Sequence, residues 1–212
     1  KSEVLNSALK ELNIKADVNI GHSMGEWFGI KSSGMVSDHF IREMLESLDP
    51  EKYKIDGIYF IALGCGKDRA KKYLDSIPDL YLSNDNCPTQ ALLCGTKEAV
   101  DKLLPELQKE QILYQPLTFQ SGFHTPFIKD KMDLLEECFS HLKFDKPEVP
   151  MWSCNSLEVY PTDPQEIKAL SVKHLLETVR FRELTEKLYN QENVRVFVQV
   201  GAGNLVGFVD DT

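Results

Sequence analysis

A serine between two glycines, Ser23 in the segment "GHSMG" (residues 21–25), has the clearest chemical signature in this sequence. A short apolar strand is predicted just before it, over 16–20, and a helix is predicted to begin at about Ser23. This order is typical of a nucleophile elbow, a strained turn in which we expect a side chain at either glycine to collide with the backbone. Backbone N–H groups at the helix start would stabilise an oxyanion. The spacing therefore predicts a serine nucleophile.

A serine hydroxyl is a weak nucleophile until a base removes its proton, so the chain must supply a base. Of the five histidines, His124 in "SGFHTP" is the candidate, because glycine and proline bound a turn where the chain leaves one predicted domain and returns to another. A cleft is expected at such a junction. Taken alone, His124 is typical of an ordinary loop histidine, and it is Ser23 that favours the catalytic interpretation. Structural or solvent-exposed positions are expected for the others: His22, His39, His141 and His174.

The residues from 57 to 119 are predicted to form a small domain of their own. The expected elements are strand 58–63, helix 67–77, strands 80–83 and 91–95, helix 97–111 and strand 112–117. A tight loop, "NDNCPT" (84–89), joins the two middle strands. This βαββαβ order is that of ferredoxin-like domains.

Residues 1–56 and 120–212 are predicted to form a larger α/β subdomain, into which the small one is inserted. Helices are expected at 2–13, from Ser37 onward, at 127–142 and within 165–190, and strands at 16–20, 149–155 and 194–200. Helices that alternate with such apolar strands favour a parallel sheet with helices on both faces. The predicted fold class is therefore α/β, with an α/β-hydrolase-like large subdomain and a ferredoxin-like small subdomain.

Composition argues against several classes of function. The hydrophobic content of 42% and charged content of 27% are ordinary for a soluble globular protein. A net charge of −9 without a basic stripe argues against a nucleic-acid partner. No apolar run is long enough to span a bilayer and the first residues do not resemble a signal peptide, so a cytoplasmic protein without a membrane partner is expected. The five cysteines lack metal-ligand spacing, so reduced thiols and no metal site are predicted.

Four separated segments are similar to the motifs of one family, the acyltransferases, which comprise malonyl-CoA:acyl-carrier-protein transacylases and the acyltransferase domains of fatty-acid and polyketide synthases. "GHSMGE" (21–26) resembles GHSxGE, "NDNCPTQALLCG" (84–95) resembles NxPxQxVxxG, "FHTP" (123–126) resembles the box that holds the base, and "TVRF" (178–181) with "VQVGAG" (198–203) resembles the closing segments. Order and spacing agree over nearly the whole chain. In the last segment, Gln199 stands where the family has an acidic residue and Ala202 where it has proline.

The resemblance implies a role for each matching residue. Ser23 resembles the nucleophile that takes the acyl group, and His124 resembles the general base. The family orients this histidine with a backbone carbonyl in the segment matching "TVRF", expected here to be that of Arg180. The Met24 N–H resembles one oxyanion donor, while a second donor and the first strand are expected in an upstream segment that this sequence does not include. Supporting polar positions are matched by Asn86, Gln90 and Asn155.

The resemblance fails at one position that bears on the substrate. Family members that take malonyl or methylmalonyl groups have an arginine 25 residues beyond the serine, whose planar fork pairs with the free carboxylate. Leu48 stands there in this chain, and Arg42 would face roughly the opposite side of the same helix. A buried carboxylate without a cation costs several kcal/mol. Phe123 resembles the bulky residue that malonyl-selective members have at this position, which favours malonyl as the substrate. We give more weight to the missing arginine, because a charge pair contributes more than a contact with a methyl group. The predicted substrates are therefore uncharged acyl groups.

The predicted activity is that of an acyl-CoA:acyl-carrier-protein S-acyltransferase that works by a ping-pong mechanism through a serine ester. A malonyl-CoA-specific transacylase, an acyl hydrolase or thioesterase, and a non-enzymatic docking remnant remain as alternatives. No permanently bound cofactor is expected, since acyl-CoA is a substrate and the phosphopantetheine belongs to the partner carrier protein or carrier domain. The chain is expected to be part of a larger multidomain synthase. Candidates for contacting an acidic carrier are Lys67, Arg69, Lys71 and Lys72.

Overall fold

The computed structural model describes residues 2–37, 39, 52–140 and 142–212. The helix predicted from Ser37 onward falls mainly on residues 40–51. It therefore lies outside the described part of the chain, and so do Leu48 and Arg42.

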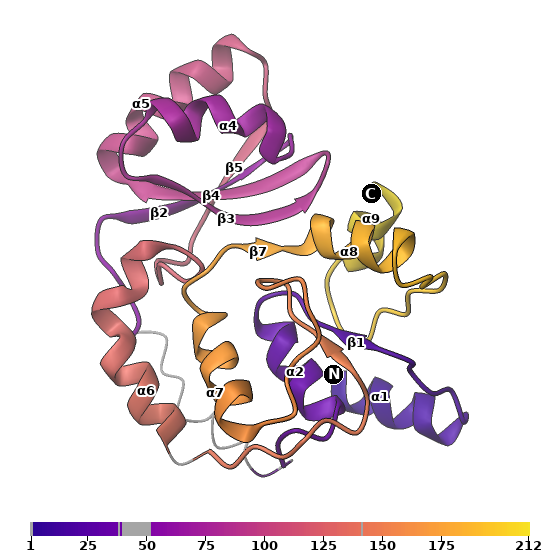
Figure 1. The fold of residues 1–212 in the computed structure, drawn as a ribbon. Helices are drawn as coiled ribbons and strands as arrows, with labels where there is room; N and C mark the ends of the chain where they lie inside the picture. The colour runs from indigo at the N-terminus through magenta and orange to yellow at the C-terminus, as the bar shows by residue number, and fades with distance from the viewer. Residues whose placement is uncertain (1, 38, 40–51, 141) are drawn as a thin grey trace.

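The predicted small domain has the expected βαββαβ order (Figure 1). Its elements are β2 (Ile58–Leu63), α4 (Lys67–Ser76), β3 (Leu80–Cys87), β4 (Gln90–Thr96), α5 (Lys97–Lys109) and β5 (Tyr114–Leu117). These four strands pair antiparallel in the order β5-β2-β4-β3, and α4 and α5 cover one face of the sheet. Helix α5 buries Ala99, Leu103 and Leu107, the spacing of one helical face. The ferredoxin-like prediction is confirmed in element order and in sheet topology.

Strand β3 is longer than predicted and carries a buried polar run from Ser83 to Asn86. The predicted loop at 84–89 shrinks to residues 88–89, because the chain stays extended until it turns into β4. The register between β3 and β4 shifts twice within this run, as at β-bulges, which redirect side chains relative to a regular strand. The bulged end of β3 thereby holds Asn86 close to the serine turn, where it contacts His22.

A fifth strand, β7 (Val179–Arg180), adds to this sheet from far along the chain. It runs parallel to β3, with Val179 opposite Asn84 and Arg180 opposite Asp85. It separates α7 (Pro164–Lys173) from α8 (Phe181–Asn190), the helices expected within 165–190. The two predicted subdomains therefore share one sheet, and their boundaries at 56/57 and 119/120 stay a prediction.

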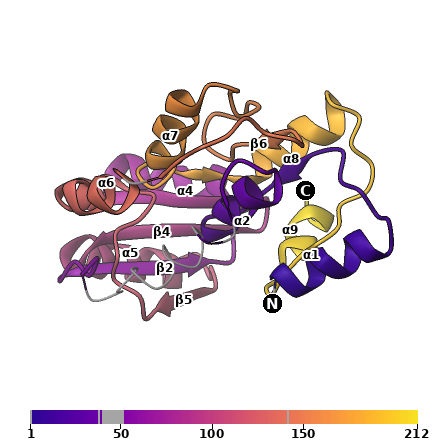
Figure 2. The ribbon, with the colours of Figure 1, turned by 90° about the horizontal axis from the view of Figure 1, so that it is seen from below.

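Outside the five-stranded sheet, the described residues form a short parallel pair, β1 (Asn19–Ile20) and β6 (Met151–Trp152). Helix α2 (Met24–Ser32) follows β1, and the 3₁₀ turn η1 (Pro126–Lys131) leads into α6 (Met132–Ser140). The helices bury one apolar cluster between them, which includes Trp27, Ile30, Ile128, Phe139, Met151, Tyr160 and Ile167. Seen from below, α6 and α1 lie at opposite sides of the molecule with α2 between them (Figure 2). The predicted α/β class is confirmed.

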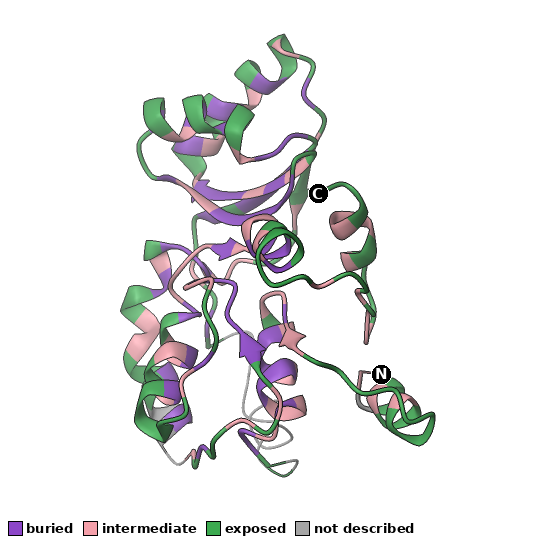
Figure 3. Ribbon diagram, turned by 45° about the vertical axis from the view of Figure 1, so that its right-hand side comes forward, coloured by how far each residue is buried: buried purple, intermediate pink, exposed green. Residues whose placement is uncertain are grey.

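The prediction of a buried strand at 194–200 is wrong. These residues are not in a strand, and Val196 and Val198 are 78% and 56% exposed. A strand needs hydrogen-bonding neighbours, and within the described residues no strand lies beside this segment. Helix α1 (Ser2–Glu11) forms as predicted, but its apolar residues are largely exposed (Figure 3). The last element is the short helix α9 (Leu205–Asp210).

Two further findings bear on the compositional predictions. Among the described residues, no helix combines the length and apolarity required to cross a membrane. Four cysteines are free and buried thiols, namely Cys65, Cys87, Cys94 and Cys154.

Candidate active site

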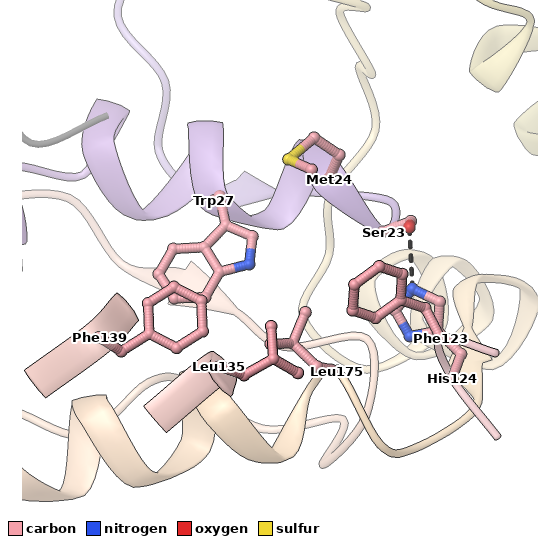
Figure 4. A pocket seen from close by; sticks show the side chains of 8 residues that line it. All are labelled: Ser23, Met24, Trp27, Phe123, His124, Leu135, Phe139 and Leu175. Carbon is pink, nitrogen blue, oxygen red and sulfur yellow. Dashed lines mark hydrogen bonds between the residues drawn. The ribbon is translucent and has the colours of Figure 1, made fainter. Parts of the chain in front are cut away.

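Ser23 sits in the strained turn that its glycine spacing predicts. Its backbone has φ 53° and ψ −121°, a left-handed conformation that is unusual for a residue other than glycine. The turn lies between β1 and α2, and Ser23 occupies the N-cap position of α2. Its side chain makes no capping hydrogen bond to the helix. The hydroxyl is therefore left to point away from the helix, toward His124 (Figure 4).

The two glycines of the turn are not equivalent. A Cβ built on Gly21 would lie 2.2 Å from the backbone nitrogen of Glu26, so no side chain fits there. A Cβ on Gly25 meets nothing within 4 Å among the described residues. The expectation of a collision is confirmed at the first glycine and wrong at the second, because Gly25 is already in the first turn of α2 and faces open space.

Ser23 and His124 meet although they are 101 residues apart. The distance from Ser23 Oγ to His124 Nε2 is 2.8 Å. On its other side, His124 Nδ1 faces two backbone carbonyls, those of His174 at 3.0 Å and Glu177 at 3.2 Å. Carbonyl oxygens only accept, so Nδ1 carries the proton and Nε2 is left with a lone pair. The ring is thus in the tautomer that can take the proton of Ser23.

The identity of the orienting carbonyl corrects the sequence-based expectation. Arg180, the residue expected to supply it, lies in β7, where its N–H bonds the Cys154 carbonyl at 2.9 Å. The chain passes His124 earlier, at the end of α7, so the carbonyls of His174 and Glu177 reach the ring instead. Both carbonyls lie just before the segment 178–181, so the prediction is wrong in the segment and misses the residue by three to six positions.

Burial keeps His124 neutral. It lowers the pKa of His124 to about 3, and the nearby His174 contributes to this lowering. A histidine with so low a pKa is unprotonated at neutral pH and free to act as a base.

Two buried residues, for which the sequence analysis predicts no role in the site, complete its polar part. His174, expected to be structural or solvated, is 1% exposed, and its Nε2 lies 3.1 Å from the carbonyl of Ser23. Its Nδ1 contacts the Asn155 side chain and lies 3.2 Å from Glu26 Oε2. Glu26 is fully buried. No local spacing could reveal this cluster, since 151 residues separate His174 from the serine.

The three polar residues expected from the resemblance are all near the site. Asn155 donates from Nδ2 to the carbonyls of Glu177 and Thr178 at 3.0 and 3.1 Å, which supports the segment that orients His124. Asn86 donates to Gln90 Oε1 at 2.8 Å and lies 2.7 Å from His22 Nε2. His22, for which no catalytic part is expected, therefore connects the serine turn to β3 and β4.

An apolar pocket of about 60 Å³ opens beside the serine and histidine (Figure 4). The described residues that line it are Ser23, Met24, Trp27, Phe123, His124, Leu135, Phe139 and Leu175. Trp27 and Phe139 stack at one end with ring centroids 4.8 Å apart. Among these lining residues none carries a formal charge when His124 is neutral, so the pocket favours an apolar group next to the nucleophile.

Comparison with known proteins places this geometry in a family. Residues 6–206 match the sequence profile described as "Acyl transferase domain". The chain is 28% identical over 207 residues to the malonyl CoA-acyl carrier protein transacylase of Bacillus subtilis (strain 168), covering 93% of this chain and 64% of that protein. It is also 28% identical over 202 residues to a polyunsaturated fatty acid synthase of Thraustochytrium sp., covering 91% of this chain and 7% of that protein.

Solved structures show the same fold. The malonyl CoA-acyl carrier protein transacylase of Coxiella burnetii superimposes with a TM-score of 0.88 at 20% identity, covering 99% of this chain and 69% of that one. The chain spans under two thirds of the length of the two sequence relatives described above. With the profile matched over nearly all of its residues, this chain belongs to the acyl transferase domain family.

Proposed function

We propose that this chain transfers an acyl group from acyl-CoA to the phosphopantetheine thiol of an acyl carrier protein, through an ester on Ser23. The observation that carries the proposal is the 2.8 Å contact between Ser23 Oγ and His124 Nε2, at a histidine whose Nδ1 proton is held by two carbonyls. The carrier protein is suggested by the names of two relatives, which are malonyl CoA-acyl carrier protein transacylases.

The residues suggest roles for each step. Ser23 Oγ attacks the thioester carbonyl while His124 Nε2 takes its proton, and the C–S bond then breaks as CoA thiolate leaves and recovers that proton. The carrier thiol next gives its proton to His124 and attacks the ester, which returns the proton to Ser23. The Met24 N–H, for which the described residues offer no hydrogen-bond acceptor, is placed at the helix start to stabilise both oxyanions.

The pocket supports uncharged acyl groups as substrates. Its described lining is apolar apart from Ser23 and His124. Among the described lining residues, a malonyl carboxylate in that space would find no cation to pair with, and a buried unpaired charge is strongly unfavourable. Leu48, at the position where the resemblance places a carboxylate-binding arginine, agrees with this choice but lies outside the described residues.

Intact-mass analysis of the full-length protein tests the proposal directly. The protein is incubated separately with acetyl-CoA, a longer acyl-CoA and malonyl-CoA, and Ser23→Ala serves as the matched control. Adducts from the neutral donors that vanish in Ser23→Ala support the proposal. Preferential labelling by malonyl-CoA would leave the acyl transferase assignment intact and overturn the substrate assignment. No adduct from any donor would instead favour a docking remnant.

A second measurement separates transfer from hydrolysis. The loss of the acyl group from labelled protein is followed with and without a phosphopantetheine-bearing carrier protein. We expect the carrier to accelerate deacylation by on the order of a hundredfold, because the apolar pocket disfavours water as the acceptor. Equal rates would identify an acyl hydrolase.

A further inference from the structure

We propose that His174 is a positioning residue held as an imidazolium, ion-paired with the carboxylate of Glu26, which fixes both the serine turn and the catalytic histidine. Its part in the reaction rests on the acyl-transfer function proposed above. Its protonation state does not, and it is argued from the contacts alone.

The orientation of the Asn155 amide determines whether Nδ1 of His174 carries a proton. Asn155 Nδ2 donates to two carbonyls, those of Glu177 and Thr178, so its oxygen is turned the other way. That oxygen contacts His174 Nδ1, and Glu26 Oε2 lies 3.2 Å from the same nitrogen. The Asn155 amide oxygen can only accept, so Nδ1 must carry a proton.

The second ring nitrogen also faces an acceptor. His174 Nε2 lies 3.1 Å from the carbonyl oxygen of Ser23. A neutral imidazole has one proton and one lone pair, and either tautomer would therefore set a lone pair against an oxygen at one of its two nitrogens. Only the imidazolium satisfies both contacts.

Glu26 is surrounded as an ionised carboxylate would be. Its Oε1 accepts from the Tyr160 hydroxyl at 2.6 Å, and its Oε2 accepts from the Cys154 N–H at 3.1 Å as well as facing His174. Burial is the main cause that raises the pKa of Glu26 to about 7 and lowers the pKa of His174 to about 4, and these values alone would put the proton on Glu26. We place it on His174 because both of its ring nitrogens face oxygen atoms that accept. Each charge is costly alone, but the pair is neutral overall and holds one proton, which the surrounding acceptors place on the imidazole.

The pair links both members of the Ser23–His124 couple. The imidazole of His174 holds the carbonyl of Ser23, whose backbone is in the left-handed region, and its own carbonyl orients His124 Nδ1. The two rings lie 5.0 Å apart between centroids. A positive charge at this distance disfavours protonation of His124, which keeps the base free.

The first test reads the proton directly by nitrogen-15 NMR of histidine rings in the full-length protein at pH 7.5. His174→Gln identifies the His174 signals by their loss. We expect both ring nitrogens of His174 to be protonated in the unmodified protein, and one of them to lose its proton in Glu26→Gln. An unprotonated ring nitrogen in the unmodified protein would overturn the imidazolium. A doubly protonated His174 in Glu26→Gln would overturn the pairing.

The second test measures the rate of Ser23 acylation against pH. His174→Gln is expected to slow acylation by on the order of tenfold to a hundredfold, with the KM for acyl-CoA little changed. In His174→Gln, the acidic side of the curve of acylation rate against pH should move to higher pH, because removing the positive charge raises the pKa of His124. The other titratable groups around His174, all of which both proteins retain, are His22, Glu26, Cys154, Tyr160 and the exposed pair Lys173–Glu177.

The outcomes separate this inference from the proposed function. A loss of rate by the same factor at every pH, with the acidic side of the curve unmoved, would show a merely structural residue and overturn the positioning role. If the unmodified protein is not acylated at all, the proposed function fails, while the NMR measurement still decides the protonation of His174. Because that measurement is made on the unmodified protein, it does not depend on the folding of a variant.

Discussion

At the scale of single residues, the site depends on a backbone conformation that most side chains avoid. Ser23 has φ 53° and His124 has φ 63°, and both are held by surrounding hydrogen bonds. Such residues cost on the order of 1–3 kcal/mol each and persist only where the surroundings compensate. Seven described residues other than glycine have a positive φ, and both members of the Ser23–His124 couple are among them, which is where a pre-organised pair requires it.

The two glycines around Ser23 give a matched pair of substitutions. Gly21→Ala is expected to lower the melting temperature strongly, because its methyl group would lie 2.2 Å from the Glu26 nitrogen, and to abolish labelling of Ser23. Gly25→Ala should raise stability slightly, by about 0.5 kcal/mol, since alanine is the better helix former and the space is open. Differential scanning calorimetry of both variants checks this. Equal destabilisation would show that the turn is packed on both sides.

The low pKa of His124 makes a prediction about stability in acid. In the unfolded chain His124 binds a proton below its ordinary pKa of 6.5, whereas in the folded protein it does so only near pH 3. The unfolded state therefore binds more protons between pH 6.5 and 3. The contribution of His124 to folding stability is complete above pH 6.5 and is lost as the pH falls from 6.5 toward 3. The Glu26–His174 pair holds one proton in both states between pH 4.5 and 6.5 and adds little there. Between pH 7.5 and 5.0, the melting temperature should fall less in His124→Gln than in the unmodified protein. A parallel fall in both would contradict the buried neutral histidine.

At the scale of elements, α8 is attached to the small sheet through a buried charge. Asp85 on β3 is fully buried, and Arg182 on α8 reaches it with Nε at 3.5 Å while bonding Asp68 of α4 at 2.9 Å. Burial raises the pKa of Asp85 and Arg182 opposes that shift. The arginine therefore connects α8 to β3 and α4 through two carboxylates, by a hydrogen bond to Asp68 and by charge attraction to Asp85, with which it makes no hydrogen bond.

Removing that arginine alone is expected to be costly. Arg182→Leu leaves Asp85 buried without its partner, which should lower the free energy of unfolding by about 3 kcal/mol. Asp85→Asn in the same chain should restore most of the loss. Lys71→Ala is the control, since it breaks an exposed pair with Asp75 and should cost under about 1 kcal/mol. Urea denaturation of the unmodified protein and these variants checks the set, and a double variant as unstable as Arg182→Leu would contradict the assignment.

The sequence predicts correctly those elements that are determined by the types and spacing of neighbouring residues. Strand β2 is predicted with its observed bounds because six consecutive residues combine apolar character with β-propensity, and the serine turn is predicted from its glycine spacing. The segment 194–200 has the same propensity and is not a strand, because pairing depends on a neighbour that propensity does not encode. The role of His174 escapes prediction for a related reason, since it comes from contacts with Ser23, Glu26 and Asn155.

At the scale of the whole molecule, the site lies where the two predicted subdomains meet. Ser23 comes from the β1–α2 turn and His124 from the segment after β5, and the contact between His22 and Asn86 ties that turn to the small sheet. The basic residues of α4, considered as a contact for an acidic carrier, are each paired with a carboxylate: Lys67 with Glu183, Arg69 and Lys72 with Glu110, and Lys71 with Asp75.

This charge distribution predicts how a carrier protein should respond to salt. With a net charge of −9 and the cations of α4 neutralised in pairs, long-range attraction to an acidic carrier is not expected. Raising NaCl from about 50 to about 300 mM shortens the screening length from roughly 14 to 6 Å, so the KM for such a carrier should stay level or fall as repulsion is screened. Acyl transfer to the carrier, measured with a small-molecule thiol acceptor as the uncharged control, checks this. A KM that rises severalfold with salt for the carrier, but not for the small-molecule thiol, would show a basic docking surface elsewhere on the protein. Carrier recognition would then be electrostatic and not dependent on the pantetheine arm.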